Sequence, residues 1–156
     1  MPDPADTVYR ERLMPTVWMY IFIALVLPAT LLVFMPISPP VGVAVGVLLY
    51  LGAIGSLIFT APVIEVAGGE LRAGRAHIPV GLLGAATGFT DGEATLERGR
   101  RLDARAYLCI RGWVKPVVRV PVEDPADPAP YWLVSTRTPE KLIAAIERSQ
   151  RLAEGA

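Results

Sequence analysis

The chain has 156 residues, of which 53% are hydrophobic and 19% charged, and its 15 basic and 15 acidic side chains give a formal net charge of zero. A neutral chain has no overall field that would attract nucleic acid or acidic substrates. A single cysteine, Cys109, excludes an intramolecular disulfide framework and suits a reducing compartment.

The first 13 residues are polar, carry both charge signs and are expected to form a cytoplasmic tail. Asp3, Asp6 and Glu11 do not fit the basic start of a secretory signal peptide. The apolar segment that follows is also too long for such a peptide. We therefore predict that this segment is retained as a membrane span.

The next part of the chain is a long stretch without charge between Arg12 and Glu65. A proline-rich segment divides it into two runs, residues 14–35 and 41–59, that each approach the ~20 apolar residues needed to cross a bilayer. The pattern predicts a two-span transmembrane helical hairpin. Pro28 removes a backbone donor from the first span, which predicts a kink in that helix.

The second span carries two pairs of small residues at four-residue spacing, Gly42 with Gly46 and Gly52 with Ser56. Small residues at this spacing let helix backbones approach closely in lipid. Two arrangements fit the pattern, namely packing of the second span against the first and a seam between two copies of the chain.

Basic residues flank the hairpin on both sides but are missing from its connecting loop. Arg10 and Arg12 precede the hairpin, and Arg72 and Arg75 follow it. Segments rich in Lys and Arg next to membrane spans remain in the cytoplasm. Both termini are therefore predicted to be cytoplasmic, with the hairpin in the plasma membrane, and the free thiol of Cys109 agrees with this orientation.

Short segments of alternating polarity, separated by turn residues, follow the hairpin and predict a β-rich domain. The predicted strands are residues 62–66, 70–73, 75–80, 106–111, 117–122 and 131–135. Residues 81–88 fit a further strand or a loop, and residues 95–102 fit a short helix or a loop. Pro121 cannot donate to a sheet, so its strand either lies at an edge or ends there.

A helix is predicted to close the domain. Thr138 as N-cap and Pro139 at the first position predict its start, and it is expected to cover residues 139–152. Its buried stripe consists of Leu142, Ile143 and Ile146.

The predicted fold class is a membrane α-helical hairpin, residues 14–59, plus an α+β cytoplasmic domain, residues 60–156. Several short strands closed by one amphipathic helix indicate a small curved β-sheet or partial barrel. This order is similar to that of bacterial pleckstrin-homology-like domains, at the level of the fold alone.

Several segments spread over nearly the whole chain carry a distinctive pattern. They are residues 9–13 (YRERL), 69–71 (GEL), 74–79 (GRAHIP), 106–108 (AYL), 111, 113–114 (WV), 124–125 and 127–128 (DP in both), 130–137 (PYWLVSTR) and 139–140 (PE). Through these segments the chain resembles the actinobacterial integral membrane proteins grouped as domain of unknown function 3093. The resemblance implies two spans, a cytoplasmic domain and a membrane location, and it implies no particular activity.

Known catalytic motifs are missing from the sequence, including phosphate-binding glycine loops, the G-x-S-x-G elbow, H-E-x-x-H and C-x-x-C. Cys109 and His77 are the only residues that could form a Cys–His pair. The ordinary alternatives are a buried, inert thiol and a half-buried histidine that is hydrogen-bonded to backbone. We expect a protein that is not an enzyme, uses no cofactor and binds no nucleic acid.

A basic run occupies the middle of the domain. It comprises Arg98, Arg100, Arg101, Arg105, Arg111, Lys115 and Arg119, with Trp113 among them and Asp103 as the one acid. Beside an anionic leaflet, each cation can add ~1 kcal/mol of attraction, so the run is a candidate contact for lipid or a protein partner. A solvated face that is balanced by acids elsewhere in the fold is an equal alternative.

Asp124 and Asp127 lie in a stiff proline-rich loop before Tyr131 and Trp132. Asp-Pro pairs usually serve turn geometry, whereas an oxygen-ligated metal needs several convergent carboxylates. The two aromatic residues could instead anchor a protein partner, because such residues are enriched at binding hot spots.

Together these features favour a membrane-anchored interaction module that docks to anionic lipid headgroups or to a membrane protein partner, with no assigned biochemical activity. The main alternative is an accessory subunit of a membrane transporter or an envelope-building enzyme. A membrane enzyme acting on lipid-linked substrates is a third possibility. It is disfavoured because the spans carry no ionisable acid or base of the kind that marks such sites.

Overall fold

The structure, a computed structural model, describes residues 7–155 and divides into two compact units. Residues 14–61 form a helical hairpin, and the segments before and after the hairpin together form an α+β unit. The α+β character and the two long apolar helices are therefore confirmed.

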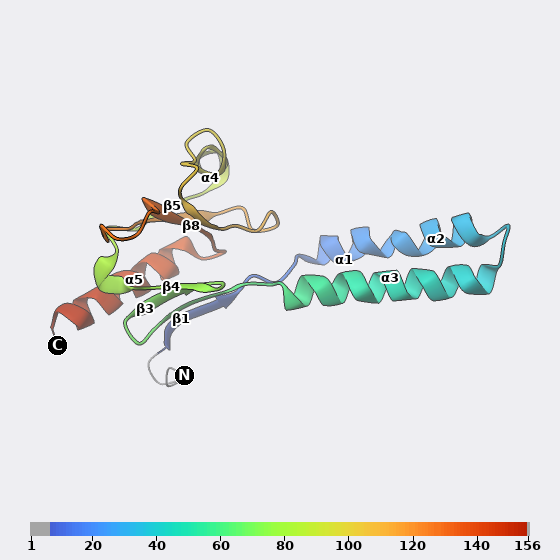
Figure 1. Ribbon diagram of the computed structural model, residues 1–156, viewed down its shortest axis with the longest axis horizontal. Helices are drawn as coiled ribbons and strands as arrows, with labels where there is room; N and C mark the ends of the chain where they lie inside the picture. The colour runs from blue at the N-terminus through green and yellow to red at the C-terminus, as the bar shows by residue number, and fades with distance from the viewer. Residues whose placement is uncertain (1–6, 156) are drawn as a thin grey trace. The chain divides into compact units, whose positions relative to one another are not determined.

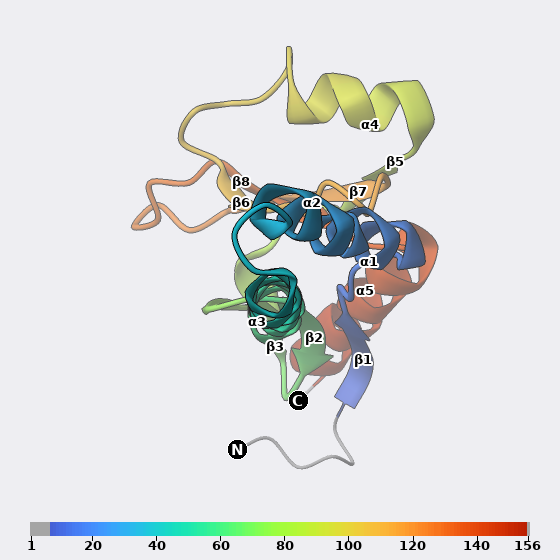
Figure 2. The same cartoon turned by 90° about the vertical axis from the view of Figure 1, so that its right-hand side faces the viewer.

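The hairpin consists of α1 (Val17–Ala24), α2 (Val26–Phe34) and α3 (Pro39–Phe59). The first two helices follow each other directly and are separated at Leu25. The ring of Pro28 would collide with the carbonyl of Ala24, four residues earlier, so the break lies one turn before the proline. The α1–α2 segment lies alongside α3, as Figures 1 and 2 show.

Gly42 and Gly46 are the buried residues of α3 and lie against α2. A Cβ atom added at Gly46 would lie 2.5 Å from the hydroxyl oxygen of Thr30, and one added at Gly42 would lie 2.9 Å from a side-chain carbon of α2. An added Cβ at Gly52 would meet nothing within 4 Å, and Ser56 is exposed. Only the first small-residue pair therefore lies in the α2–α3 contact.

The first sheet is antiparallel and has the order β1-β2-β3-β4, formed by β1 (Thr7–Arg12), β2 (Val63–Ala67), β3 (Glu70–Ala73) and β4 (Ala76–Pro79). Gly68 and Gly69 connect β2 to β3 with φ angles of 57° and 75°. Two-residue hairpin turns require such positive angles, which other residues rarely adopt. Val66 and Leu71 pair across this hairpin and are fully buried.

The tail expected before the first span is, within the described residues, an edge strand; residues 1–6 lie outside them. β1 pairs with β2, with Arg12 opposite Val63, and the Leu13 amide donates to the Pro62 carbonyl at 3.0 Å. The polar sequence of β1 gave no strand signal because its pairing partner follows only after the hairpin. Both ends of the hairpin therefore join neighbouring, paired strands of one sheet.

The second sheet has the order β5-β7-β8-β6, formed by β5 (Thr87–Phe89), β6 (Tyr107–Cys109), β7 (Val117–Pro121) and β8 (Tyr131–Ser135). β6 runs parallel to β8, and the other pairs are antiparallel. β7 is an interior strand that ends at Pro121, so the proline marks a strand end and not an edge.

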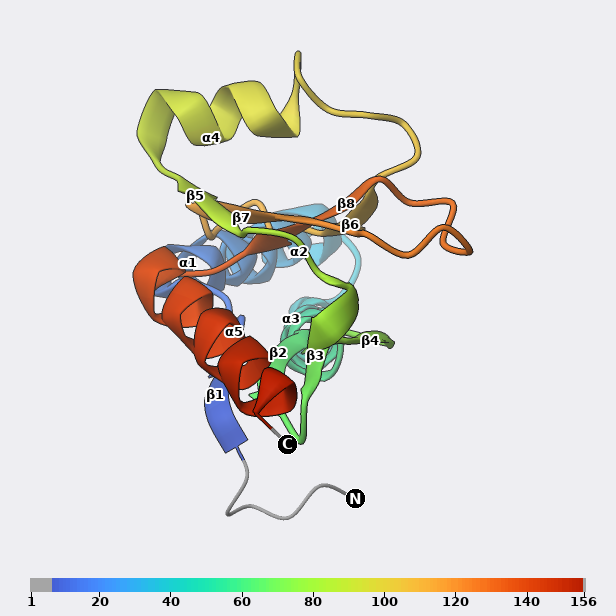
Figure 3. The ribbon, with the colours of Figure 1, turned by 90° about the vertical axis from the view of Figure 1, so that its left-hand side faces the viewer.

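Two helices, α4 (Asp91–Arg98) and α5 (Pro139–Glu154), lie on opposite sides of the second sheet (Figure 3). Side chains of β8 alternate accordingly. Tyr131 and Leu133 pack with Ala94 of α4, whereas Trp132 and Val134 join the core on the α5 side. Every residue of β8 is buried because both faces of the strand are covered.

The structure assigns the two segments for which the sequence allowed either a regular element or a loop. Residues 81–88 contain parts of both predicted states: η2 (Val80–Leu82), a bridge from Leu83 to Val122, and then β5. The short helix expected at residues 95–102 begins earlier, as α4, and stops before Gly99 instead of continuing through it.

One hydrophobic core joins both sheets and α5. Leu71 of the first sheet, Val120 of the second, and Leu142 and Ile146 of α5 are each fully buried in it. Burial of side chains of this size contributes roughly 1.5–3 kcal/mol each. The single curved sheet or partial barrel predicted from the sequence differs from this arrangement, in which two open sheets share a core with α5.

Candidate functional site

Glu97, near the end of α4, is a charged residue with only 2% of its surface exposed. Its Oε2 atom accepts a hydrogen bond from Nη1 of Arg119 at 3.3 Å, and its Oε1 atom accepts one from Nη1 of Arg101 at 3.4 Å. Arg101 also pairs with Glu93 at 2.7 Å. The four-residue step places Glu93 and Glu97 on one side of α4, and the turn after the helix, in which the Arg101 amide donates to the Leu96 carbonyl, brings Arg101 back to them.

Arg119 and Tyr131 lie on the α4 side of the second sheet, on the neighbouring strands β7 and β8. The Arg119 guanidinium lies 4.1 Å from the centre of the Tyr131 ring, a cation–π contact. The Tyr131 hydroxyl accepts from the Asp103 amide at 2.7 Å and donates to the Arg101 carbonyl at 3.4 Å. These bonds fasten the segment after α4 to β8.

Asp103 has its own basic partner. Arg105 donates to it through its backbone amide at 2.8 Å and through its guanidinium at 3.4 and 3.3 Å. The guanidinium hydrogen bonds, followed by the amide hydrogen bond, lower the pKa of Asp103 below its ordinary value. The carboxylate is therefore ionised at neutral pH and already paired.

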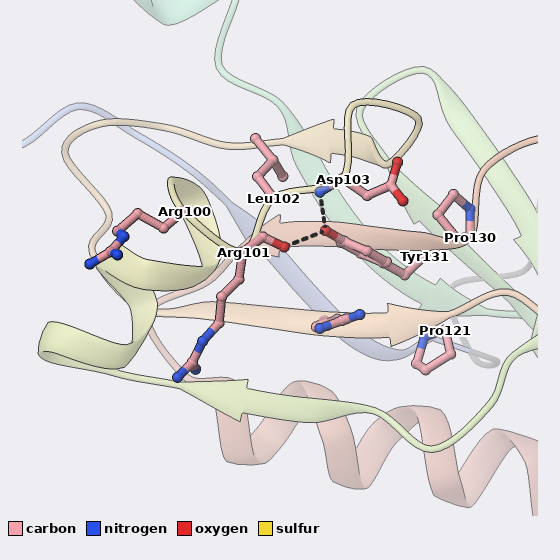
Figure 4. Close-up of a pocket in the computed structure, with 8 residues that line it drawn as sticks. Arg100, Arg101, Leu102, Asp103, Pro121, Pro130 and Tyr131 are labelled. Carbon is pink, nitrogen blue, oxygen red and sulfur yellow. Dashed lines mark hydrogen bonds between the residues drawn. The ribbon is translucent and has the colours of Figure 1, made fainter.

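These groups surround a pocket of about 400 Å³, shown in Figure 4 with the two hydrogen bonds of the Tyr131 hydroxyl. It is lined by Arg100, Arg101, Leu102, Asp103, Arg119, Pro121, Pro130 and Tyr131. Its walls are apolar where the prolines and the tyrosine ring lie, and its charged groups are three arginines and the paired aspartate.

The structure divides the predicted basic run into two places. Arg100, Arg101 and Arg119 line the pocket, and Arg105 joins them through its bond to Asp103. Arg98 donates to the Ala94 carbonyl within α4. Several of these cations are therefore partly neutralised by Glu93, Glu97 and Asp103, as the alternative of a balanced face had anticipated.

Arg111, Trp113 and Lys115 lie apart from the pocket, between β6 and β7. The Trp113 indole donates to the Leu13 carbonyl at 3.3 Å and packs against the main core, while the Arg111 guanidinium lies 5.9 Å from its ring. Trp113 thus has an internal contact, and its predicted contact with lipid or a partner stays a prediction. Lys115 is exposed.

The proline-rich loop is built on its own backbone. Asp124 accepts from the Ala126 amide at 2.9 Å and Asp127 from the Ala129 amide at 2.8 Å, as expected for aspartates that shape turns. In the described residues 7–155, no group of three or more His, Cys, Asp or Glu side chains is placed to hold a metal ion.

Tyr131 and Trp132 are not the exposed partner anchor that the sequence suggested. They are only 3% and 4% exposed, because β8 is an interior strand that is covered by α4 on one face and by α5 on the other. Trp132 contacts Tyr107 in a tilted arrangement, with ring centroids 4.6 Å apart and an interplanar angle of 47°. Tyr131 reaches a surface only where its ring lines the pocket.

The two other candidate reactive residues, Cys109 and His77, differ in burial. Cys109 is buried in β6, and this burial raises the pKa of its thiol, an effect that Arg111 partly opposes. His77 was expected to be half-buried, but it is exposed on the edge strand β4. The inert-thiol interpretation therefore fits Cys109.

A second polar cluster connects β1 to the start of α5. The Glu11 carboxylate accepts from the Tyr9 hydroxyl at 2.7 Å, from the Thr136 hydroxyl at 2.6 Å and from the Arg137 amide at 3.1 Å. Thr138 stands at the N-cap but does not cap the helix with its side chain, because its hydroxyl lies 2.9 Å from that of Tyr9. The side-chain oxygens of Tyr9, Glu11, Thr136 and Thr138 all take part in hydrogen bonds within the cluster, so we assign it a structural role.

Sequence reasoning named the arginines of the pocket but missed Glu97. Its four-residue spacing to Glu93 was a usable signal, but the segment predicted as a short helix or a loop, residues 95–102, left Glu93 out. The pairing of Glu97 with Arg119 joins residues 22 positions apart, and no local pattern predicts such a contact.

The fold and the pocket define an α+β protein with two helical segments, Val17–Phe34 and Pro39–Phe59, that are long and apolar enough to span a membrane. A family described as protein of unknown function, DUF3093, matches residues 8–146, nearly the whole chain. The chain belongs to this family, which confirms the resemblance drawn from its sequence. No curated protein and no solved structure matches the chain.

Proposed function

We propose that this protein is a two-span membrane protein whose β-rich unit is a non-enzymatic binding module on the cytoplasmic side of the plasma membrane. The observation that carries the proposal is the insertion of the helical hairpin between β1 and β2. Those strands are hydrogen-bonded neighbours, so they lie on one side of any membrane. For two helices that span the bilayer, ends that meet in this way place both ends of the hairpin on the same side.

The surface of the hairpin supports a lipid environment. Phe22, Leu32 and Leu48 are exposed by 67%, 70% and 71% within the hairpin. At 1.5 Å per residue, the 18-residue α1–α2 segment and the 21-residue α3 reach about 27 and 32 Å, close to the ~30 Å hydrocarbon core. Their apolar side chains would be costly in water and are favourable in lipid.

The charged residues next to the hairpin support the cytoplasmic side. Arg10 and Arg12 lie in β1, Arg72 lies in β3, and Arg75 lies in the following turn, while residues 35–38 between α2 and α3 carry no charge. Positively charged flanks are retained in the cytoplasm. The buried free thiol of Cys109 is compatible with a reducing compartment.

The binding role rests on the arginine-lined pocket and on exposed cations of the basic run. Arg100 and Lys115 are exposed, and the pocket presents Arg101 and Arg119. A tether in the membrane raises the effective concentration of such a surface near anionic lipid headgroups, so weak attraction suffices for docking. We therefore assign anionic lipid as the class of partner.

Native mass spectrometry of the full-length protein, gently extracted from its own membranes, tests this function. We expect a chain that retains anionic lipid, with less lipid retained by a variant carrying Arg100→Gln and Lys115→Gln. An Arg148→Gln variant, altered at an exposed position on α5, is the matched control. A retained protein subunit without lipid would contradict the proposal and favour an accessory subunit of a membrane complex.

A further inference from the structure

We propose that the pocket between the end of α4 and strands β7 and β8 binds a phosphate group, carried either by a lipid headgroup or by a small soluble molecule. The inference rests on the binding role proposed above, but it does not depend on the side of the membrane on which the unit lies. It names the ligand chemistry and the residues that recognise it.

The charge of the pocket favours an anion. Arg100, Arg101 and Arg119 line it, and the acid in its lining, Asp103, is already engaged by Arg105 through both carboxylate oxygens. Arg100 is exposed and has no hydrogen bond or ion pair to another residue in the described part of the chain. Arg101, Arg105 and Arg119 are set against Glu93, Glu97 and Asp103, so Arg100 is the pocket cation that no acid of the described residues compensates.

Glu97 fixes two of the arginines in position. It is buried and contacts Nη1 of Arg101 and Nη1 of Arg119, and Glu93 pairs with the same Nη1 of Arg101, which leaves the other guanidinium N–H donors of both residues available. Arg119 is held further by stacking on the Tyr131 ring at 4.1 Å. A guanidinium held in this way loses little conformational freedom when it binds a ligand, so the site is pre-organised.

The number of arginines favours phosphate over carboxylate. One guanidinium can satisfy both oxygens of a carboxylate with two parallel hydrogen bonds. A phosphate carries more charge and more acceptor oxygens, which can be shared among several arginines. The volume of about 400 Å³ is near the small end of ligand pockets, and Leu102, Pro121 and Pro130 offer apolar walls to the group that carries the phosphate.

Isothermal titration calorimetry tests this inference on the full-length protein in phosphatidylcholine nanodiscs. The probes are glycerol 3-phosphate and inorganic phosphate, with acetate as the carboxylate comparison. We expect saturable binding of glycerol 3-phosphate that is weakened about tenfold or more by Arg100→Gln or Arg119→Gln, because each removes a charge-assisted hydrogen bond. Arg148→Gln should bind like the unchanged protein.

The outcomes separate the two phosphate sources. If nanodiscs containing phosphatidylglycerol suppress binding of glycerol 3-phosphate, the natural ligand is a lipid headgroup; if they do not, it is a soluble phosphate compound. Failure of the unchanged protein to bind glycerol 3-phosphate, or equal binding by Arg100→Gln, would overturn the inference. Arg100 lies in an exposed turn, so its replacement decides the question even if Arg119→Gln unfolds.

These results do not depend on the membrane topology. A protein whose β-rich unit lay on the outer side would still bind the probe, because both faces of a nanodisc are open to solvent. Loss of the proposed function and loss of the phosphate site can therefore be told apart.

Discussion

At the scale of single residues, Glu97 organises the candidate site. Its buried carboxylate balances the charge of two guanidiniums from different parts of the chain, those of Arg101 and Arg119. The side chains of these arginines are 51% and 38% exposed, so water can replace part of a lost contact. Each of the two ion pairs of Glu97 therefore stabilises the fold less than a fully buried ion pair would.

Replacing Glu97 by Gln should lower the free energy of unfolding by about 1–3 kcal/mol, because two arginines lose their shared anion while the buried amide must find new partners. Urea unfolding of the full-length protein in detergent micelles measures this change. Glu147→Gln, at an exposed position of α5, is the control and should change stability by less than about 0.5 kcal/mol. Equal stabilities of the two variants would contradict the role given to Glu97.

Cys109 gives a prediction about pH at the same scale. Its thiol pKa is raised by burial, so at pH 8 it should be alkylated by iodoacetamide at least about tenfold more slowly in the folded protein than in urea. Because the folded protein disfavours the charged thiolate, the free energy of unfolding should decrease as pH rises above the thiol pKa of the unfolded chain. Fast alkylation of the native protein at pH 8 would disprove the burial.

At the scale of secondary-structure elements, glycines decide how α2 and α3 meet. Replacing Gly46 by Leu should destabilise the hairpin by about 1–3 kcal/mol, because the new side chain would occupy the space of Thr30. Gly52→Leu is the matched control, since an added side chain there meets open space within this chain. Thermal unfolding in micelles, followed by circular dichroism, measures both; equal loss of stability would argue against the observed packing.

The contact between β1 and the start of α5 explains part of the sequence resemblance. Tyr9 and Glu11 belong to its first segment, and Thr136 and Arg137 to a late one. The structure brings these residues into a single hydrogen-bonded cluster around the Glu11 carboxylate. These residues therefore hold β1, which precedes the hairpin, to the start of α5, which is a structural role.

At the scale of the whole molecule, the β-rich unit should fold without the hairpin. Joining Leu13 to Pro62 through Asn-Gly would replace 48 residues, 14–61, by a two-residue turn of the kind that connects paired strands. We expect a soluble protein with cooperative urea unfolding and a protected Cys109 thiol. An aggregated product, or one that lacks cooperative unfolding, would show that the two units depend on one another.

The sequence predicted those features that are set by local pattern. Composition and length located both apolar helices, Pro28 predicted the kink, and Pro139 marked the start of α5. Features set by distant contacts were missed, because β1 finds its partner beyond the hairpin. For the same reason, the analogy to a single curved sheet did not anticipate the division into two open sheets, with α4 covering the outer face of the second.

The candidate site was predicted to a similar extent. Its arginines were visible as a basic run, but their balance of charge depends on Glu97, Glu93 and Asp103, which only the fold brings close. The sequence indicated Tyr131 as a possible anchor for a protein partner. In the structure its ring instead forms the cation–π contact with the Arg119 guanidinium.

The central claim is that both ends of the hairpin, and the unit attached to them, lie on the cytoplasmic side. The most direct measurement is labelling of single cysteines by a membrane-impermeant maleimide in intact cells, in a Cys109→Ser background. Ile37→Cys, 77% exposed in the α2–α3 connection, should be labelled in intact cells, and Arg148→Cys on α5 only after lysis. Labelling of Arg148→Cys in intact cells, with or without labelling of Ile37→Cys, would contradict the account.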